Sequence, residues 1–276
     1  MTDTLLQYAF FQHALIGSLL ASVLCGLVGT YVVTRRLVFV SGGVAHASLG
    51  GVGLGAYFGF PPLLGAAAFA LFSGFSVQWL SRRREVREDS AIAMLWTFGM
   101  SIGILCTYLA PGFITDLPSF LFGNILSVTR ADLYLLGILA AIAATIYILL
   151  LRTIVAVAYD RDFARTQGLP VHAVEALLTA LTALSVVGCL HMMGIVLVIS
   201  LLSVPQMTAG LFARTFGSMA LLSIAFAVAG CMGGLLLSYW YNVPSGATIV
   251  LLSILIYFSS KAIKSLLSGL YGKSPA

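Results

Sequence analysis

Residues 131–151 read ADLYLLGILAAIAATIYILLL, an apolar run with no charged side chain after Asp132. About 20 apolar residues in a row are long enough to cross a bilayer as a helix. The whole chain has 276 residues, of which 60% are hydrophobic and only 8% charged, whereas a soluble domain carries roughly a quarter charged residues. The composition excludes a soluble enzyme, a secreted disulfide scaffold and a disordered tail. It predicts an all-α, polytopic integral membrane bundle that forms one domain over residues 1–276.

Similar apolar runs divide the chain into about nine transmembrane helices. Proline, glycine and clusters of charge separate most of them, because these residues interrupt apolar helices. The break at Met192–Met193 is the weakest, so the sixth and seventh segments form either a tight hairpin or one span, which would leave eight helices. The predicted segments are residues 11–33, 37–59, 62–80, 90–110, 131–151, 172–191, 193–213, 217–239 and 246–267.

The placement of Lys and Arg predicts the orientation. If nine crossings start from an outside N-terminus, thirteen of the 14 basic residues lie on the inner side, and only Arg130 lies outside. Cytoplasmic loops carry the excess of Lys and Arg, so we expect the N-terminus outside and the C-terminus in the cytoplasm. The net charge of +5 therefore reflects topology and does not indicate a nucleic-acid partner. The four cysteines lie in apolar stretches without a CxxC pair and are expected to pack between helices.

The longest inner connection, residues 152–170, mixes charged and apolar residues at helical spacing and ends near Gly168. This pattern predicts a short amphipathic helix on the cytoplasmic side. The helix would either rest on lipid headgroups or dock a soluble partner. Asp160 and Asp162 balance Arg161 and Arg165, and such a balance favours a protein partner over anionic lipid.

The second apolar segment carries His46 among many glycines. Glycines on one helix face allow another helix to approach closely, and here we expect them to leave space in front of the imidazole. An ionisable side chain at membrane depth usually faces a bundle interior or a water-filled path. His46 is therefore either hydrogen-bonded to a neighbouring helix or a transient ligand of a metal ion. The glycines assigned to helix packing are Gly42, Gly43, Gly50, Gly51 and Gly55.

The seventh segment places several polar or small side chains on one helical face, and Pro205 should kink or open the helix there. A broken helix with hydroxyl groups can line a cavity, although serines also mediate plain helix contacts. The preceding turn, His191 to Met193, has ligand types that attract transition metals but no carboxylate to complete a site. Together with His46, the residues assigned to an ion path are Ser48, Ser200, Ser203, Gln206 and Met207.

The sequence contains no P-loop and no catalytic motif of a hydrolase or dinucleotide-dependent enzyme. We therefore expect a transport subunit and not an enzyme. If ATP drives the transport, another chain must hydrolyse it.

Seven pieces of the chain, in order, resemble the metal-type permeases of bacterial ATP-binding-cassette importers, which take up zinc, manganese or iron. The resemblance covers nearly the whole chain. The seven pieces are residues 26–36, the His46 segment, and residues 88–92, 121–126, 158–164, 202–209 and 244–247.

The resemblance implies a homodimer in the bacterial cytoplasmic (inner) membrane, with a pore between the protomers and two cytoplasmic ATPase subunits. An extracytoplasmic metal-binding lipoprotein or periplasmic binding protein would deliver the divalent ion, and no cofactor would be bound permanently. The stretch from Asp160 to Gly168 would be the coupling helix on the ATPase, with Arg161, Asp162, Phe163 and Ala164 in it.

This chain departs from the family pattern at two places. Members commonly carry an aspartate one turn before the histidine, where this chain has Gly42, and their Pro-Ala-Ala-Thr-Ala run reads PQMTA at residues 205–209 here. Oxygen ligands suit Mn²⁺ and imidazole suits Zn²⁺, so the metal stays open. We also expect segments two and seven to line a shared pore, with cysteines at some positions between Gly50 and Gly55 cross-linking the two protomers.

Three other functions fit the composition. A siderophore or cobalamin permease would have a wider path for a chelated substrate. An ion-coupled secondary carrier would need intramembrane carboxylates, which are absent from the middle of the apolar segments. A membrane anchor subunit without transport activity would not need a path at all.

Overall fold

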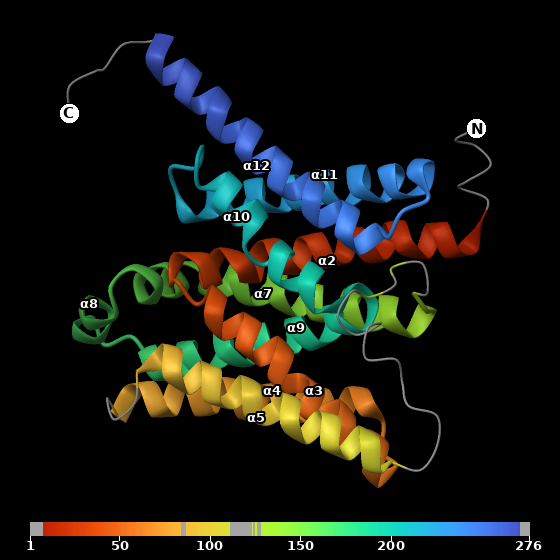
Figure 1. The fold of residues 1–276 in the computed structure, drawn as a ribbon. Coiled ribbons are helices and arrows are strands. Elements are labelled where there is room, and N and C mark those ends of the chain that lie inside the picture. The colour runs from red at the N-terminus through yellow and green to blue at the C-terminus, as the bar shows by residue number, and fades with distance from the viewer. Residues whose placement is uncertain (1–7, 84–86, 111–122, 124, 126–127, 271–276) are drawn as a thin grey trace.

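The computed structural model describes residues 8–83, 87–110, 123, 125 and 128–270. These residues form helices joined by short turns (Figure 1). The helices are α2 (Ala9–Thr34), α3 (Val38–Phe58), α4 (Pro62–Arg83), α5 (Glu88–Leu109), α7 (Arg130–Tyr159), α8 (Arg161–Thr166), α9 (Val171–Leu201), α10 (Val204–Ala209), α11 (Phe216–Tyr241) and α12 (Ser245–Leu270).

Eight helical stretches of the described chain are long and apolar enough to cross a membrane. Most of the predicted boundaries agree with the helices to within a few residues. The fifth segment is an exception, because α7 continues beyond residue 151 to Tyr159. Residues 152–159 therefore extend a transmembrane helix, and the amphipathic helix of the 152–170 connection shrinks to the six residues of α8.

The stretch Val171–Ala209 reverses direction at Gly194, whose φ of 73° and ψ of 164° are not helical. Before the reversal, α9 runs antiparallel to α2: Glu175 faces Arg35 at one end and Met192 faces Gly17 at the other. After it, Leu202 returns to Gly29 in the second half of α2. The weak break at Met192–Met193 is thus a true reversal, and we call residues 194–213 the return segment.

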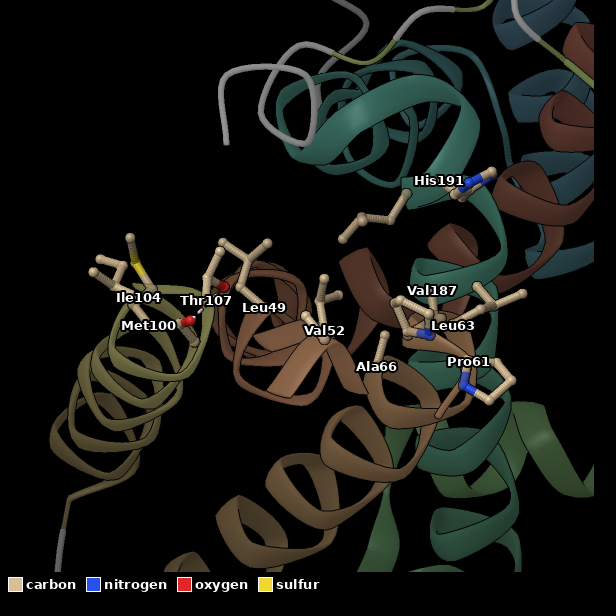
Figure 2. Close-up of a pocket in the computed structure, with 14 residues that line it drawn as sticks. Leu49, Val52, Pro61, Leu63, Ala66, Met100, Ile104, Thr107, Val187 and His191 are labelled. Carbon is tan, nitrogen blue, oxygen red and sulfur yellow. Dashed lines mark hydrogen bonds between the residues drawn. The ribbon is translucent and has the colours of Figure 1, made fainter. Parts of the chain in front are cut away.

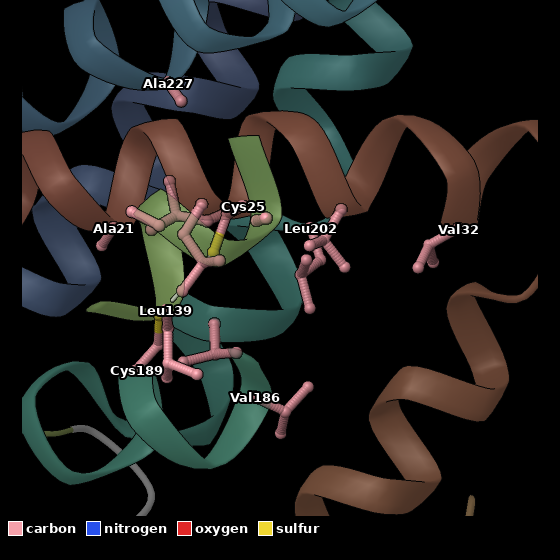
Figure 3. Close-up of a cluster of buried hydrophobic side chains, with 14 of the residues drawn as sticks. Ala21, Cys25, Val32, Leu139, Val186, Cys189, Leu202 and Ala227 are labelled. Atoms are coloured by element: carbon pink, nitrogen blue, oxygen red, sulfur yellow. Dashed lines mark hydrogen bonds between the residues drawn. The ribbon is translucent and has the colours of Figure 1, made fainter. Parts of the chain in front are cut away.

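The helices form two groups. Figure 1 shows α3, α4 and α5 together below α2, α7 and α9, with α11 and α12 on the other side. The largest buried cluster joins α2, α7, α9 and α11 (Figure 3) and also includes Ala45 and Leu49 of α3. Within it the Sγ atoms of Cys25 and Cys189 are 3.8 Å apart and both thiols are free, so the prediction of packing cysteines is confirmed for this pair.

The bundle has two ends. We call one the α8 end, because α8 lies there with the turn between α2 and α3, and the other the Gly194 end, where α7 begins and the N-terminal part of α2 contacts Tyr239 of α11 (Figure 1). The basic residues Arg35, Arg161 and Arg165 lie at the α8 end, whereas Arg130 begins α7 at the Gly194 end.

Candidate metal path and docking helix

Glycines bring α3 into backbone contact with α5 and α4. A Cβ added to Gly50 would lie 2.8 Å from the carbonyl oxygen of Gly99, and one added to Gly53 would lie 2.7 Å from the Cα of Gly103. Gly51 meets Gly65 of α4 in the same way. Because lipid tails are as apolar as the helices, such close van der Waals contact is what holds membrane helices together. Gly50 and Gly51 thus lie at close helix contacts, and the packing role assigned to them stays a prediction.

This contact places Trp96 of α5 on the imidazole of His46. The two rings are stacked, with centroids 4.1 Å apart and planes 9° apart. The indole Nε1 donates to the sulfur of Met100 at 2.9 Å, which fixes the ring. The Nδ1 atom of His46 is buried and has no hydrogen-bond partner among the described residues. Among the described residues, His46 is therefore not hydrogen-bonded to a neighbouring helix.

The expectation of free space in front of His46 is wrong for most of the glycine face. Gly43 packs against Ile92, and Gly50 packs against Gly99, so α5 fills that side. Gly42 differs, because the nearest atom to a Cβ added there is Cδ1 of Ile199 at 3.6 Å. The one open position on this face is thus the position at which an aspartate was expected from the resemblance.

The return segment comes close to α3 through Ile199, which is followed by Ser200. The Ser200 hydroxyl is buried without a hydrogen-bond partner among the described residues. The Ser203 hydroxyl donates to the carbonyl of Ile199 at 2.7 Å, and the chain breaks there before α10 begins at Val204, with Pro205 as its second residue. The break predicted from Pro205 is therefore present, two residues earlier than the proline.

Three other residues assigned to the path do not face His46. The Gln206 side chain is buried, and its Nε2 donates to the carbonyls of Cys25 at 2.8 Å and Leu201 at 3.0 Å. Gln206 thus ties the break in the return segment to α2. Ser48 is buried and donates to the carbonyl of Ala45. Met207 is 46% exposed on the outside of the chain. Their part in an ion path stays a prediction.

At the other candidate site, Asp160 is the N-cap of α8. Its Oδ1 accepts from the backbone N–H groups of Asp162 at 3.0 Å and Phe163 at 2.9 Å. The Phe163 side chain is 56% exposed, whereas Ala164 is fully buried. Gly168 has a φ of 73° and ends the turn after α8. The short helix therefore presents one aromatic side chain outward from a capped, anchored support.

An apolar cavity of about 260 Å³ lies between α3, α4, α5 and α9 (Figure 2). Leu, Val, Ala and Pro side chains line most of it, and the Thr107 hydroxyl is turned to the carbonyl of Gly103. His191 lies at its upper edge in Figure 2, and its Nδ1 is 3.1 Å from Oδ1 of Asp132. Such a lining offers no compensation to a hydrated cation.

The turn from His191 to Met193 does not bring its three side chains together with further ligands among the described residues. Met192 and Met193 are both fully buried, and the described residues contain no group of three or more His, Cys, Asp and Glu side chains arranged to hold a metal. His191 therefore pairs with Asp132 and does not act with the two thioethers.

Two features of these sites were missed from the sequence. Trp96 is the tryptophan of its apolar segment, and an indole that must satisfy its N–H inside a bundle signals a specific contact. Glu175 is a carboxylate near the start of an apolar segment, and such a residue is usually paired and functional.

The profile of the ABC 3 transport family matches residues 7–264. An uncharacterized membrane protein of Synechocystis sp. is 41% identical over 259 residues, covering 94% of this chain and 92% of that protein. The manganese transport system membrane protein MntC of Halalkalibacterium halodurans is 32% identical over 255 residues, covering 92% of this chain and 87% of that protein.

Among solved structures, PsaBC from Streptococcus pneumoniae in complex with Fab contains a similar chain. The TM-score is 0.85 at 28% sequence identity, and the match covers 94% of this chain and 93% of that chain.

Proposed function

This chain belongs to the ABC 3 transport family, and from that membership we propose that it is the membrane-spanning permease of an ATP-driven importer of divalent transition metal ions. It is a multi-pass membrane protein. Relatives named as manganese transport proteins support manganese as a substrate, and zinc and iron are kept as alternatives.

The observation that carries the proposal is the state of His46. It is a half-buried imidazole inside a transmembrane helix, fixed by Trp96 and without a hydrogen-bond partner among the described residues. A neutral imidazole binds divalent transition metals. With Gly42 in place of a carboxylate, the contact is weak and suits passage and release.

Energy would come from a separate ATPase bound at α8. The chain has no nucleotide-binding motif, and α8 offers the exposed Phe163 beside a cap at Asp160. Basic residues at the α8 end favour a cytoplasmic location for it. The N-terminus would then lie outside, together with the site at which a metal-binding protein delivers the ion.

Two protomers would form the path. His46 and Trp96 lie next to a face of α5 that exposes Thr97 and Ser101. A second copy against this face would enclose His46. The glycines from Gly50 to Gly55 are used within one protomer, so the cross-links expected at those glycines are replaced by cross-links on α5.

The described transmembrane helices do not support an ion-coupled carrier. Their carboxylates, such as Asp132 and Glu175, lie near helix ends and are paired. Proton- or sodium-coupled carriers rely on carboxylates within the membrane. A siderophore or cobalamin permease would transport a chelated substrate, whereas a metal permease would transport the free ion. Uptake of free and chelated ions therefore distinguishes the two functions.

The test is uptake into proteoliposomes that contain this chain, its ATPase and its binding protein. Mn²⁺, Zn²⁺ and Fe²⁺ are supplied one at a time, either free or as a siderophore chelate. ATP-dependent uptake of a free ion supports the proposal. Uptake of only the chelate, or uptake driven by an ion gradient without ATP, contradicts it.

A further inference from the structure

Glu175 is a buried carboxylate that binds two arginines from different parts of the chain. Its side chain is 4% exposed. Oε1 is 2.6 Å from Nε of Arg161 and 3.8 Å from Nη2 of Arg35. A charge removed from water to this extent is costly unless it is paired. Both arginines are therefore needed at this site, and neither is an incidental surface contact.

The three residues join three elements that are far apart in the sequence. Arg161 is the first residue of α8, Glu175 lies in the first two turns of α9, and Arg35 is the C-cap of α2. Arg36 follows with a φ of 58°, a left-handed conformation that costs energy for a side chain other than glycine. The chain then enters α3, the helix that carries His46.

The space beside the carboxylate is not filled by close packing. A polar cavity of about 180 Å³ adjoins Glu175 and Arg161 and is lined by α3, α4 and α9, with Tyr31, Gln78 and Ser81 among its polar residues. Beside this cavity, two ion pairs connect α8 to the corner of α2 and α3.

We propose that Glu175 is a positioning residue that transmits movement of α8 to the corner between α2 and α3, and so to the helix that carries His46. The inference rests on the proposed function, because it takes α8 as the element that the ATPase moves. When α8 shifts, Arg161 pulls on Glu175, and Arg35 follows because it shares the same carboxylate. Phe163 provides the contact with the ATPase, and Glu175 links α8 to Arg35 at the end of α2.

The test uses the full complex in proteoliposomes, with Mn²⁺ and Zn²⁺ each supplied alone. Glu175→Gln keeps the size of the side chain and removes its charge. We expect the number of ions transported per ATP hydrolysed to fall by about fivefold or more, the lower range of a typical coupling between sites. Binding of the ATPase should not change, because Phe163 and the Asp160 cap are untouched. Asp89→Asn is the control, since it removes an exposed carboxylate that pairs with Arg87 at 3.0 Å.

A double-mutant cycle distinguishes a loss of coupling between α8 and the corner of α2 and α3 from a simple loss of folding. Arg161→Gln, Glu175→Gln and the double variant are compared with the wild type, together with Glu175→Asp, which keeps the charge. If Glu175 acts through Arg161, the double variant is no worse than either single variant, and Glu175→Asp restores part of the coupling. Fully additive losses, or a Glu175→Gln complex with wild-type ions per ATP, overturn the inference.

A wild-type complex without ATP-dependent uptake would instead overturn the proposed function, so the two failures are distinguishable. If the Glu175→Gln variant does not insert into the membrane, the Arg161→Gln variant is used for the test. Its side chain is 44% exposed and its loss is better tolerated. If this variant transports as many ions per ATP hydrolysed as the wild type, the inference is overturned. If it transports fewer ions per ATP but still binds the ATPase normally, the inference is supported.

Discussion

At the scale of the residue, His46 combines a fixed ring with an unsatisfied nitrogen. Trp96 holds the imidazole by stacking and its own N–H is bound to Met100. In the proposed function, this support would pre-organise the side chain for a metal ion. The same arrangement leaves the buried Nδ1 atom without a partner.

We predict that His46→Ala lowers ATP-dependent uptake by about tenfold or more, the size of effect seen when metal sites lose part of their support. Insertion in the membrane and binding of the ATPase should be unchanged, because His46 makes no hydrogen bond to other helices in the described structure. His172→Ala is the matched control, since this exposed histidine lies in the first turn of α9. Unchanged uptake of Mn²⁺, Zn²⁺ and Fe²⁺ by the His46 variant would reduce His46 to a packing residue.

Gly42 allows the opposite change at the same site. Gly42→Asp places a carboxylate one turn from His46, and its Cβ meets only Ile199 at 3.6 Å. We predict tighter binding of Mn²⁺, which prefers oxygen ligands, and slower release in single-turnover uptake. Gly42→Asn adds a side chain of the same shape without the charge and should not show this gain. Equal effects of both variants would mean that shape, and not charge, causes the change.

At the scale of the element, the glycines of α3 differ in how closely they are packed: some contact the backbone of a neighbouring helix, and Gly42 does not. Gly53→Ala pushes a methyl group against the backbone of Gly103. Overpacking of this kind costs about 1–3 kcal/mol, so the thermal midpoint in detergent should fall. Gly42→Ala adds the same methyl group where there is room and should leave the midpoint nearly unchanged. Equal midpoints for both variants would contradict the close contact between α3 and α5.

In the short helix α8, the residues that hold the helix in place differ from the residue that is exposed for contact with a partner. Asp160 caps the helix and Ala164 is buried beneath it, whereas Phe163 is exposed. We predict that Phe163→Ala weakens binding of the ATPase subunit by tenfold or more, about the loss expected for a central interface anchor, without unfolding the permease. Phe58→Ala removes another exposed ring at the Gly194 end and should not affect binding. ATPase affinity is measured in detergent with both purified variants.

At the scale of the whole molecule, we propose that a second protomer completes the path. One copy leaves His46 and Trp96 half-buried beside the exposed face of α5, and this face is where the partner should lie. We predict that Thr97→Cys forms a disulfide-linked dimer in membranes, in a Cys106→Ser background. Thr145→Cys places the same residue on the exposed face of α7 and should stay monomeric. Cross-linking at both sites alike would indicate random collision and remove the support for this interface.

Much of the fold could be predicted because it depends on local properties of the chain. Runs of apolar residues predict membrane helices, since a backbone without water must satisfy its own hydrogen bonds. Gly, Pro and charge predict where these helices end. Pro205 and the weak break near Met193 predicted the interrupted return segment, although the reversal itself is set by Gly194.

The candidate sites depended on contacts between segments distant in sequence, and there the sequence was a poorer guide. It singled out His46 but not Trp96, which reaches it only because Gly50 and Gly53 let α5 approach. It did not indicate that the Gln206 amide binds the carbonyl of Cys25 on α2. A helical face predicted from spacing does not specify which neighbour it will meet.

The sequence by itself determined that this chain is a multi-pass membrane protein with a histidine inside one span and a short charged helix between two others. Hydropathy and helix geometry act within a single segment, so the membrane helices can be predicted from each segment separately. Only the tertiary structure decided that His46 is stacked on Trp96 and that Glu175 joins α8 to α2. Packing of helices in a membrane depends on how closely small residues allow two backbones to approach, and that is a property of pairs of segments.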